Sequence, residues 1–118
     1  MARFGDALMT GADLVNAAER AVLAALEQVD GPVDLVCFFV CGTDPEEVTL
    51  AGKRVMELAG DVVTIGCSCT GVIGGGRGVE GQGAVSVWCA ALPGADLTPF
   101  RLDTVIEGDH LAVIGMRE

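Results

Sequence analysis

The first 65 residues alternate between apolar runs and amphipathic segments, and this alternation constrains the fold more than any other feature of the chain. Apolar runs at residues 3–9, 33–41 and 62–65 predict strands. Between them, residues 13–29 and 45–59 carry apolar side chains every three to four positions, as amphipathic helices do. This order predicts an α/β fold with mostly parallel strands, right-handed crossovers and helices covering the sheet.

Capping signals place the ends of both expected helices. Thr10 to Asp13 has the hydroxyl and acid spacing of a capping box, and Gly31 with Pro32 ends the first helix. Asp44 followed by Pro45 predicts the start of the second helix, and Gly60 its end. The strand at 33–41 is apolar apart from one aspartate, which predicts burial on both faces.

The second half of the chain contains no helical pattern. Residues 84–92 and 97–102 predict strands, and the Pro-Gly-Ala-Asp sequence at 93–96 predicts the turn between them. A short apolar run at 111–114 suggests one more strand. We expect these strands to form an antiparallel β-meander that completes the α/β domain.

Length and composition bound the class of protein. The 118 residues make one domain, 1–118, with no linker. Hydrophobic residues make up 51%, so either nearly all of the chain is core or a partner covers part of its surface. A net charge of −10 disfavours nucleic acid and anionic lipid as partners. No apolar run is long enough to span a membrane.

Cysteine usage and the start of the chain predict a cytoplasmic location. The first ten residues have no apolar segment of the secretory type, and five cysteines are an odd number for a disulfide framework. We therefore expect reduced thiols. Cys37, Cys41 and Cys89 lie in apolar strand patterns, where free cysteine acts as a small apolar residue.

Glycine is concentrated in the stretch from Val62 to Cys89. Eight of the 17 glycines lie between Gly66 and Gly83, and three of the five cysteines belong to the same stretch. Glycine permits a positive φ and a close approach of backbone or ligand, at an entropic cost that an ordinary loop need not carry. We expect the recognition site of the domain here.

Known motifs match this stretch only in part. Residues 76–81 read G-x-G-x-x-G, but a strand follows them instead of the helix that a dinucleotide site needs. Residues 66–71 have the glycine spacing of a phosphate-binding loop without its lysine. Cys67 and Cys69, joined by Cys41, are a weak candidate for a metal or redox site, and the lone His110 has no histidine partner. The sequence predicts no metal, no cofactor and no catalytic residue.

Arg77 and Glu80 are the only charged residues between Asp61 and Asp96. They could contact a charged ligand, or they could hold the loop by an ion pair, and the sequence leaves both open. If the pair contacts a ligand, backbone N–H groups of residues 74–76 can form an anion-binding nest for a carboxylate, with Arg77 as the counter-charge.

The stretch IGCSCTGVIGGGRGVEGQGAVSVWCAALPG, preceded by a helix and by VDLVCFFV, resembles the FIST N-terminal domain. The positions that carry the resemblance are Gly66-Cys67, Gly71, 72–76, Arg77, Glu80, 91–94 and Pro99-Phe100. The similarity covers residues 3–115. It implies an α/β sensory domain that binds an amino acid or related metabolite, is no enzyme, and passes a signal to attached domains.

Two departures from this family stand out. Gly78 occupies the position where such proteins usually have a glutamate, so the role of that side chain does not carry over. The chain also resembles only the first half of the module, whose second portion would cover a sheet edge and an apolar face. From this we expect a homo-oligomer, because exposed edges and apolar faces attract further copies.

The sequence therefore predicts a non-enzymatic small-ligand-binding domain of the signal-transduction type. An alternative is a self-assembling structural protein whose loop and apolar surface form subunit contacts. A thiol redox enzyme using Cys67 and Cys69 ranks last. The expected ligand-binding residues are Gly66, Cys67, Thr70, Gly71, Gly74, Gly75, Gly76, Arg77 and Glu80.

Overall fold

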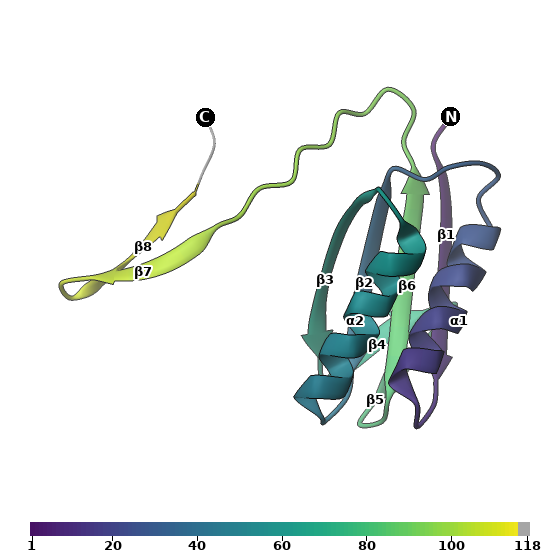
Figure 1. The fold of residues 1–118 in the computed structure, drawn as a ribbon, viewed down its shortest axis with the longest axis horizontal. Coiled ribbons are helices and arrows are strands. Elements are labelled where there is room, and N and C mark those ends of the chain that lie inside the picture. The colour runs from purple at the N-terminus through teal and green to yellow at the C-terminus, as the bar shows by residue number, and fades with distance from the viewer. Residues whose placement is uncertain (116–118) are drawn as a thin grey trace.

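The computed structural model describes residues 1–115, which form two helices, a four-stranded sheet and two separate hairpins (Figure 1). The elements in chain order are β1 (Arg3–Thr10), α1 (Leu14–Glu27), β2 (Leu35–Cys41), α2 (Pro45–Ala59), β3 (Val63–Cys69), β4 (Gly71–Gly74), β5 (Arg77–Glu80), β6 (Ala84–Ala91), β7 (Asp103–Glu107) and β8 (His110–Ile114). Neither helix is long and apolar enough to cross a membrane.

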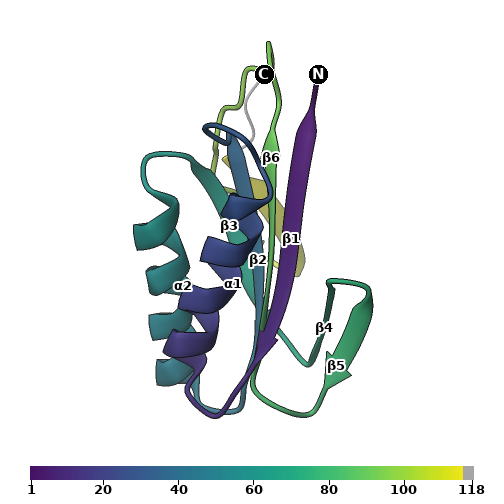
Figure 2. The ribbon, with the colours of Figure 1, turned by 90° about the vertical axis from the view of Figure 1, so that its right-hand side faces the viewer.

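The central sheet has the strand order β1-β6-β2-β3. β2 and β3 are parallel, and β6 is antiparallel to both of its neighbours, β1 and β2. The strands β1, β2 and β3 therefore all run in one direction, with β6 inserted between the first two. The predicted α/β class is confirmed, and both helices cover the same face of the sheet (Figure 2).

The second half of the chain differs from the expected meander. β6 returns into the middle of the sheet instead of pairing with a following strand, and residues 97–102 contain no strand. A turn at Pro93-Gly94 follows β6, within the predicted turn at 93–96, and residues 95–102 then lead without helix or strand to the hairpin β7–β8, which lies apart from the sheet (Figure 1). β6 thus pairs in the antiparallel sense, as predicted, but its partners are the distant strands β1 and β2 and not the strand that follows it.

Side-chain caps fix where both helices begin. The Asp13 carboxylate accepts a hydrogen bond from the Asn16 N–H at 3.1 Å, and the Asp44 carboxylate accepts one from the Glu46 N–H at 3.0 Å. The first helix ends at Glu27, before the expected Gly31-Pro32 stop. The second ends as predicted at Gly60, whose φ of 79° suits a glycine. The predicted start of α2 at Asp44-Pro45 and its predicted end at Gly60 are therefore both confirmed.

The main core lies between the sheet and the helices. Small residues of α1 allow close packing, and a Cβ at Gly5 of β1 would lie 2.2 Å from the Ala25 carbonyl oxygen. The core consists chiefly of Ala17, Ala18, Ala21, Val22 and Ala25 of α1, Ala51 and Val55 of α2, and Val36, Phe38, Val40, Val85, Val87 and Cys89 of the sheet. These contacts bury the helix-facing side chains of β2 and β6, whereas Gly66 and Ser68 of the edge strand β3 stay exposed on that face.

The opposite face of the sheet is covered only in part, by the hairpin β4–β5 (Figure 2). Leu8, Cys41 and Ala84 of the sheet are buried with Val72 and Val79 of the hairpin. The prediction that β2 is buried on both faces is wrong in its middle, because Phe39 lies beyond the hairpin and is exposed. The sequence pattern misses this because aromatic side chains are apolar whether or not something covers them.

Candidate functional site

One cavity, which we call the main cavity because it is more enclosed than the larger hollows of the surface, opens where the carboxyl ends of β1, β2 and β3 meet the start of β6. Its volume is about 370 Å³, which is in the range of small-molecule sites. In α/β sheets, ligands commonly bind outside the carboxyl ends of parallel strands. Its walls are formed by Gly11, Ala12, Leu14, Cys41, Gly42, Thr43, Glu47, Cys69, Thr70, Gly81, Gln82 and Gly83.

Close backbone approach shapes this cavity. The Gly11 N–H donates to the Gly83 carbonyl oxygen at 3.2 Å, which ties the end of β1 to the start of β6. A Cβ at Gly83 would lie 2.7 Å from the Gly11 carbonyl oxygen, and one at Gly42 would lie 2.6 Å from Leu14 Cδ1. Glycine is therefore required at position 83, where the obstacle is backbone, whereas a side chain at position 42 would have to displace the terminal methyl of Leu14.

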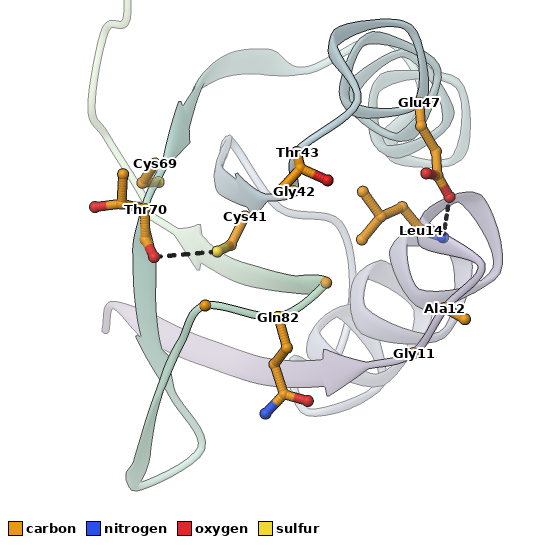
Figure 3. Close-up of a pocket in the computed structure, with 12 residues that line it drawn as sticks. Gly11, Ala12, Leu14, Cys41, Gly42, Thr43, Glu47, Cys69, Thr70 and Gln82 are labelled. Carbon is orange, nitrogen blue, oxygen red and sulfur yellow. Dashed lines mark hydrogen bonds between the residues drawn. The ribbon is translucent and has the colours of Figure 1, made fainter.

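Glu47 supplies the one charged side chain of the cavity wall. Its Oε1 accepts a hydrogen bond from the N–H of Leu14, the first residue of α1, at 3.2 Å. The carboxylate of a first-turn residue of α2 thus lies against the start of α1, as Figure 3 shows. Both helix N-termini favour negative charge at this point, and no lysine or arginine belongs to the wall.

Two thiols form another part of the wall. Cys41 and Cys69 are directly opposite each other on β2 and β3, and Cys67 is two residues before Cys69 on the same face of β3. The Cys41 thiol donates to the Thr70 carbonyl oxygen at 3.3 Å (Figure 3). Burial, and then the neighbouring Cys67 thiol, raise the pKa of Cys69 above the ordinary thiol value. A raised pKa keeps this thiol neutral at pH 7 and makes it a poor nucleophile.

The structure separates the residues that the sequence singled out. Of the predicted ligand-binding residues, Thr70 alone belongs to the wall of the main cavity. Gly66 points toward the helices, where an added Cβ would lie 2.3 Å from the Phe38 ring, and Cys67 is exposed on the opposite face of β3. Gly66 is thus explained by packing.

The glycine-dense loop forms the turn of the hairpin β4–β5. Gly75 and Gly76 both have a positive φ, 56° and 80°, as a two-residue type I′ turn requires. The Gly75 N–H donates to the Asp6 carboxylate at 2.7 Å, and Arg77 Nη2 donates to the Leu8 carbonyl oxygen at 2.9 Å. The turn thus already holds a carboxylate of its own chain, and binding of an external anion there stays a prediction.

The remaining predicted residues lie along the same hairpin. Gly71 and Glu80 are paired where the hairpin begins and ends, and with Thr70 they border a separate surface hollow of about 750 Å³. Gly74 lies near the turn, where an added Cβ would lie 2.7 Å from Ser86 Oγ. The Ser86 hydroxyl donates to the Ile73 carbonyl oxygen at 2.7 Å, which fastens the hairpin to β6.

Sequence reasoning missed most of the cavity wall, although a signal for it was present. Gly11-Ala12, Gly42-Thr43 and Cys69-Thr70 each lie at or just after the end of a parallel strand. Because the carboxyl ends of parallel strands lie at the same edge of a sheet, these three pairs together indicate a site at that edge. The positions 81–83 had no such signal, because the insertion of β6 between β1 and β2 is a long-range feature.

Metal-binding groups do not gather within residues 1–115: no three His, Cys, Asp or Glu side chains are placed to hold a metal ion. His110 lies in the hairpin β7–β8, where its Nδ1 is 3.1 Å from Asp109 Oδ1. All five cysteines belong to the described residues and carry free thiols. The chemistry available at the cavity is thus that of one carboxylate, two thiols, two hydroxyls and an amide.

Comparison with known proteins gives a distant relationship. No family model matches the chain. Two uncharacterized proteins of Mycobacterium tuberculosis, from strains CDC 1551 / Oshkosh and ATCC 25618 / H37Rv, are each 29% identical to it over 126 residues. The match covers 98% of this chain and 30% of each relative, so the chain spans about a third of the length of the curated relatives it matches.

Proposed function

We propose that this chain is a non-enzymatic ligand-binding domain of the sensory type, and that its main cavity receives a small molecule with an amino group, such as an amino acid. The observation that carries this proposal is the Glu47 carboxylate in a wall without lysine or arginine. One oxygen of this carboxylate accepts from the Leu14 N–H, and its remaining lone pairs can accept from a cationic donor. The resemblance to the FIST N-terminal domain supports the same ligand class.

The proposal moves the binding position away from the glycine-dense turn. The Gly75 N–H and the Arg77 guanidinium already bind Asp6 and Leu8, so an external ligand would have to displace them. In the main cavity, by contrast, the hydroxyl of Thr43 and the amide of Gln82 can donate to the carboxylate of an amino acid. Glu47 then accepts from the ammonium group of the same ligand.

Binding without catalysis is supported by the nature of the thiols. A nucleophilic cysteine needs a lowered pKa, and burial raises the pKa of Cys69. Cys41 donates its proton to a backbone carbonyl oxygen and has no basic side chain among its partners in the cavity wall. With five free thiols, we also propose a cytoplasmic location, where cysteines stay reduced.

The test is a thermal-shift and calorimetric screen of amino acids, each paired with the analogue that has a hydroxyl in place of the amino group. A ligand at 100 times its Kd adds about 2.7 kcal/mol to the free energy of unfolding. We expect stabilisation by one or more amino acids and none by the paired hydroxy acids. No stabilisation by any amine would contradict the proposal.

Glu47→Gln is the variant that isolates the carboxylate. Gln keeps an oxygen that can accept from the Leu14 N–H and removes the charge, so the fold is retained. A lost charged hydrogen bond of about 1.5–3 kcal/mol predicts a Kd roughly 10 to 150 times higher. Glu46→Gln is the matched control, because Glu46 is in the same helical turn and outside the cavity wall. Equal effects of both variants would remove Glu47 from the site.

A second candidate function is self-assembly. It is favoured by a separate observation, the large apolar side chains that the sheet and the last hairpin leave exposed. Ligand binding and assembly use different parts of the molecule, so they are compatible.

A further inference from the structure

The sheet face that the helices do not cover carries an apolar surface beside the hairpin β4–β5. We call it the open face, and its residues are Phe4, Cys37, Phe39, Ile65, Cys67 and Trp88. They share a face because Cys37 is opposite both Ile65 and Trp88 in the sheet, and Phe39 is opposite Cys67. Phe4 stacks on Trp88 with ring centroids 5.6 Å apart. None of these six side chains is charged, and the charged residue beside them on the same face, Asp6 opposite Trp88, accepts from the Gly75 N–H.

Large parts of the open face are accessible. Phe4 is 54% exposed, Phe39 40% and Ile65 65%. With roughly 200 Å² for a large side chain, these three residues alone expose about 300 Å² of contiguous apolar surface. A patch of about 300 Å² is comparable to the largest apolar patch of a typical monomer, and such patches are often functional, so the open face is suited to bind a partner.

The hairpin β7–β8 carries a second apolar surface on the same chain. Ile106 is opposite Leu111, and Val113 follows two residues later on the same side. Their exposed fractions are 79%, 72% and 54%. With the same roughly 200 Å² for each side chain, they expose about 400 Å² of apolar surface. A two-stranded hairpin is at best marginally stable alone in water, so it needs a surface to pack on.

The course of the chain before this hairpin directs it away from its own open face. Ala95 and Leu97 border a small cavity with Val62 and Val63 at the start of β3, so the extended segment passes over that end of the sheet. The hairpin then lies beyond the β3 side of the sheet, at a distance from it (Figure 1). A neighbouring molecule is therefore a more accessible partner than the same molecule.

We propose that two copies of this chain exchange their β7–β8 hairpins, each hairpin packing its Ile106, Leu111 and Val113 side on the open face of the other copy. In a two-fold pair both surfaces are covered at once. Each copy then buries about 700 Å², and the pair buries about 1,400 Å², which falls within the 1,200–2,000 Å² of stable interfaces. The acidic side chains Glu107 and Asp109 lie at the tip of the hairpin, where a rim contact can leave them in water.

Light scattering coupled to size exclusion tests the pair on the 118-residue chain. We expect about twice the monomer mass of 12.1 kDa at tens of micromolar. Leu111→Asp on the hairpin and Ile65→Asp on the open face should each give a monomer, with the dimer Kd raised at least 100-fold. Both residues are exposed, so a retained circular dichroism spectrum is expected as well.

The matched control is Leu50→Asp, which makes the same change at an exposed leucine of α2, outside both surfaces. It should leave the mass at that of the dimer. A monomeric wild-type chain at tens of micromolar would overturn the proposal. So would a dimer that survives both Leu111→Asp and Ile65→Asp, because the contact would then lie elsewhere.

Cross-linking decides whether the hairpin reaches its own face or that of the partner. Ile106→Cys places a thiol on the hairpin, and Cys67 is the exposed native thiol of the open face. A bismaleimide should produce a covalent dimer on a denaturing gel, and the Ile106→Cys, Cys67→Ser double variant should not. A link within one chain, seen by mass spectrometry at monomer mass, would refute exchange.

Discussion

Gly66→Ala tests whether this glycine serves packing or ligand binding. Gly66 belongs to the glycine-rich stretch that the sequence associates with recognition, yet its added Cβ would lie 2.3 Å from two carbon atoms of the Phe38 ring. Its φ is not among the positive values of the chain, so backbone strain adds nothing to the effect. The Phe38 ring is buried and lies so close to α2 that a Cβ at Gly52 would be 3.2 Å from it, which limits how far the ring can move.

The expected magnitude follows from two opposing effects. Overpacking a core typically costs about 1–3 kcal/mol, whereas Gly→Ala gains about 0.4–1 kcal/mol by restricting the unfolded chain. We expect a net loss of about 1–2 kcal/mol in the free energy of unfolding, or a Tm lower by about 4–8 °C for a domain of this size. Phe38→Leu removes the ring atoms that the new Cβ would meet. In the Phe38→Leu background, Gly66→Ala should therefore cost at most half of what it costs in the wild-type chain.

Urea denaturation followed by circular dichroism measures these free energies. Gly78→Ala is the matched control, since its added Cβ would meet nothing closer than 3.9 Å and its φ is not positive. Its effect should stay within about 0.5 kcal/mol. The packing argument is refuted if Gly66→Ala is as stable as wild type, or if Phe38→Leu brings no recovery.

Two further predictions concern the hairpin β4–β5 and the thiols. Asp6→Ala removes the acceptor of the Gly75 N–H and should destabilise the hairpin by about 1 kcal/mol. Hydrogen exchange should show this as faster exchange of the amides at residues 72–79. The control Asp30→Ala, at an exposed aspartate, should leave the exchange of these amides unchanged. Cys67 should react first with a maleimide at pH 7.5, because burial raises the pKa of Cys37, Cys69 and Cys89. Because the pKa values of these three thiols are raised in the folded state, their contribution to the free energy of unfolding is present below about pH 8.5 and is lost as the pH rises further. Fastest labelling at Cys69 would count against the thiol assignments. Unchanged midpoints of urea denaturation from pH 8 to 10 would count against them as well.

Much of the local structure could be predicted because it depends on neighbours in the sequence. The acid and proline at Asp44-Pro45 and the glycine at Gly60 bound α2 correctly, since caps act within one helical turn. The strand β3 was predicted too short, ending at Ile65, because Gly66-Cys67-Ser68-Cys69 lacks large apolar side chains. Pairing with β2 along its whole length keeps that segment extended.

The cavity could not be predicted in the same way. Thr70 belongs to the glycine-rich stretch that predicts recognition, whereas Glu47 has the sequence context of an ordinary residue in the first turn of a helix. Its contact with the Leu14 N–H joins residues 33 positions apart, and no local pattern encodes that pair. Conversely, Arg77 has the sequence context of a ligand contact, and the fold uses it to hold the hairpin on β1.

The sequence by itself determined the class of fold and the caps of α2, because hydrophobic period and backbone preference are properties of short segments. Tertiary structure alone decided that β6 enters between β1 and β2, which brings residues 81–83 to the ends of the parallel strands and closes the cavity. It also decided which apolar side chains remain exposed. The order of the strands and the covering of each sheet face depend on long-range packing. One apolar run in the sequence is compatible with many strand orders and with either a covered or an exposed face.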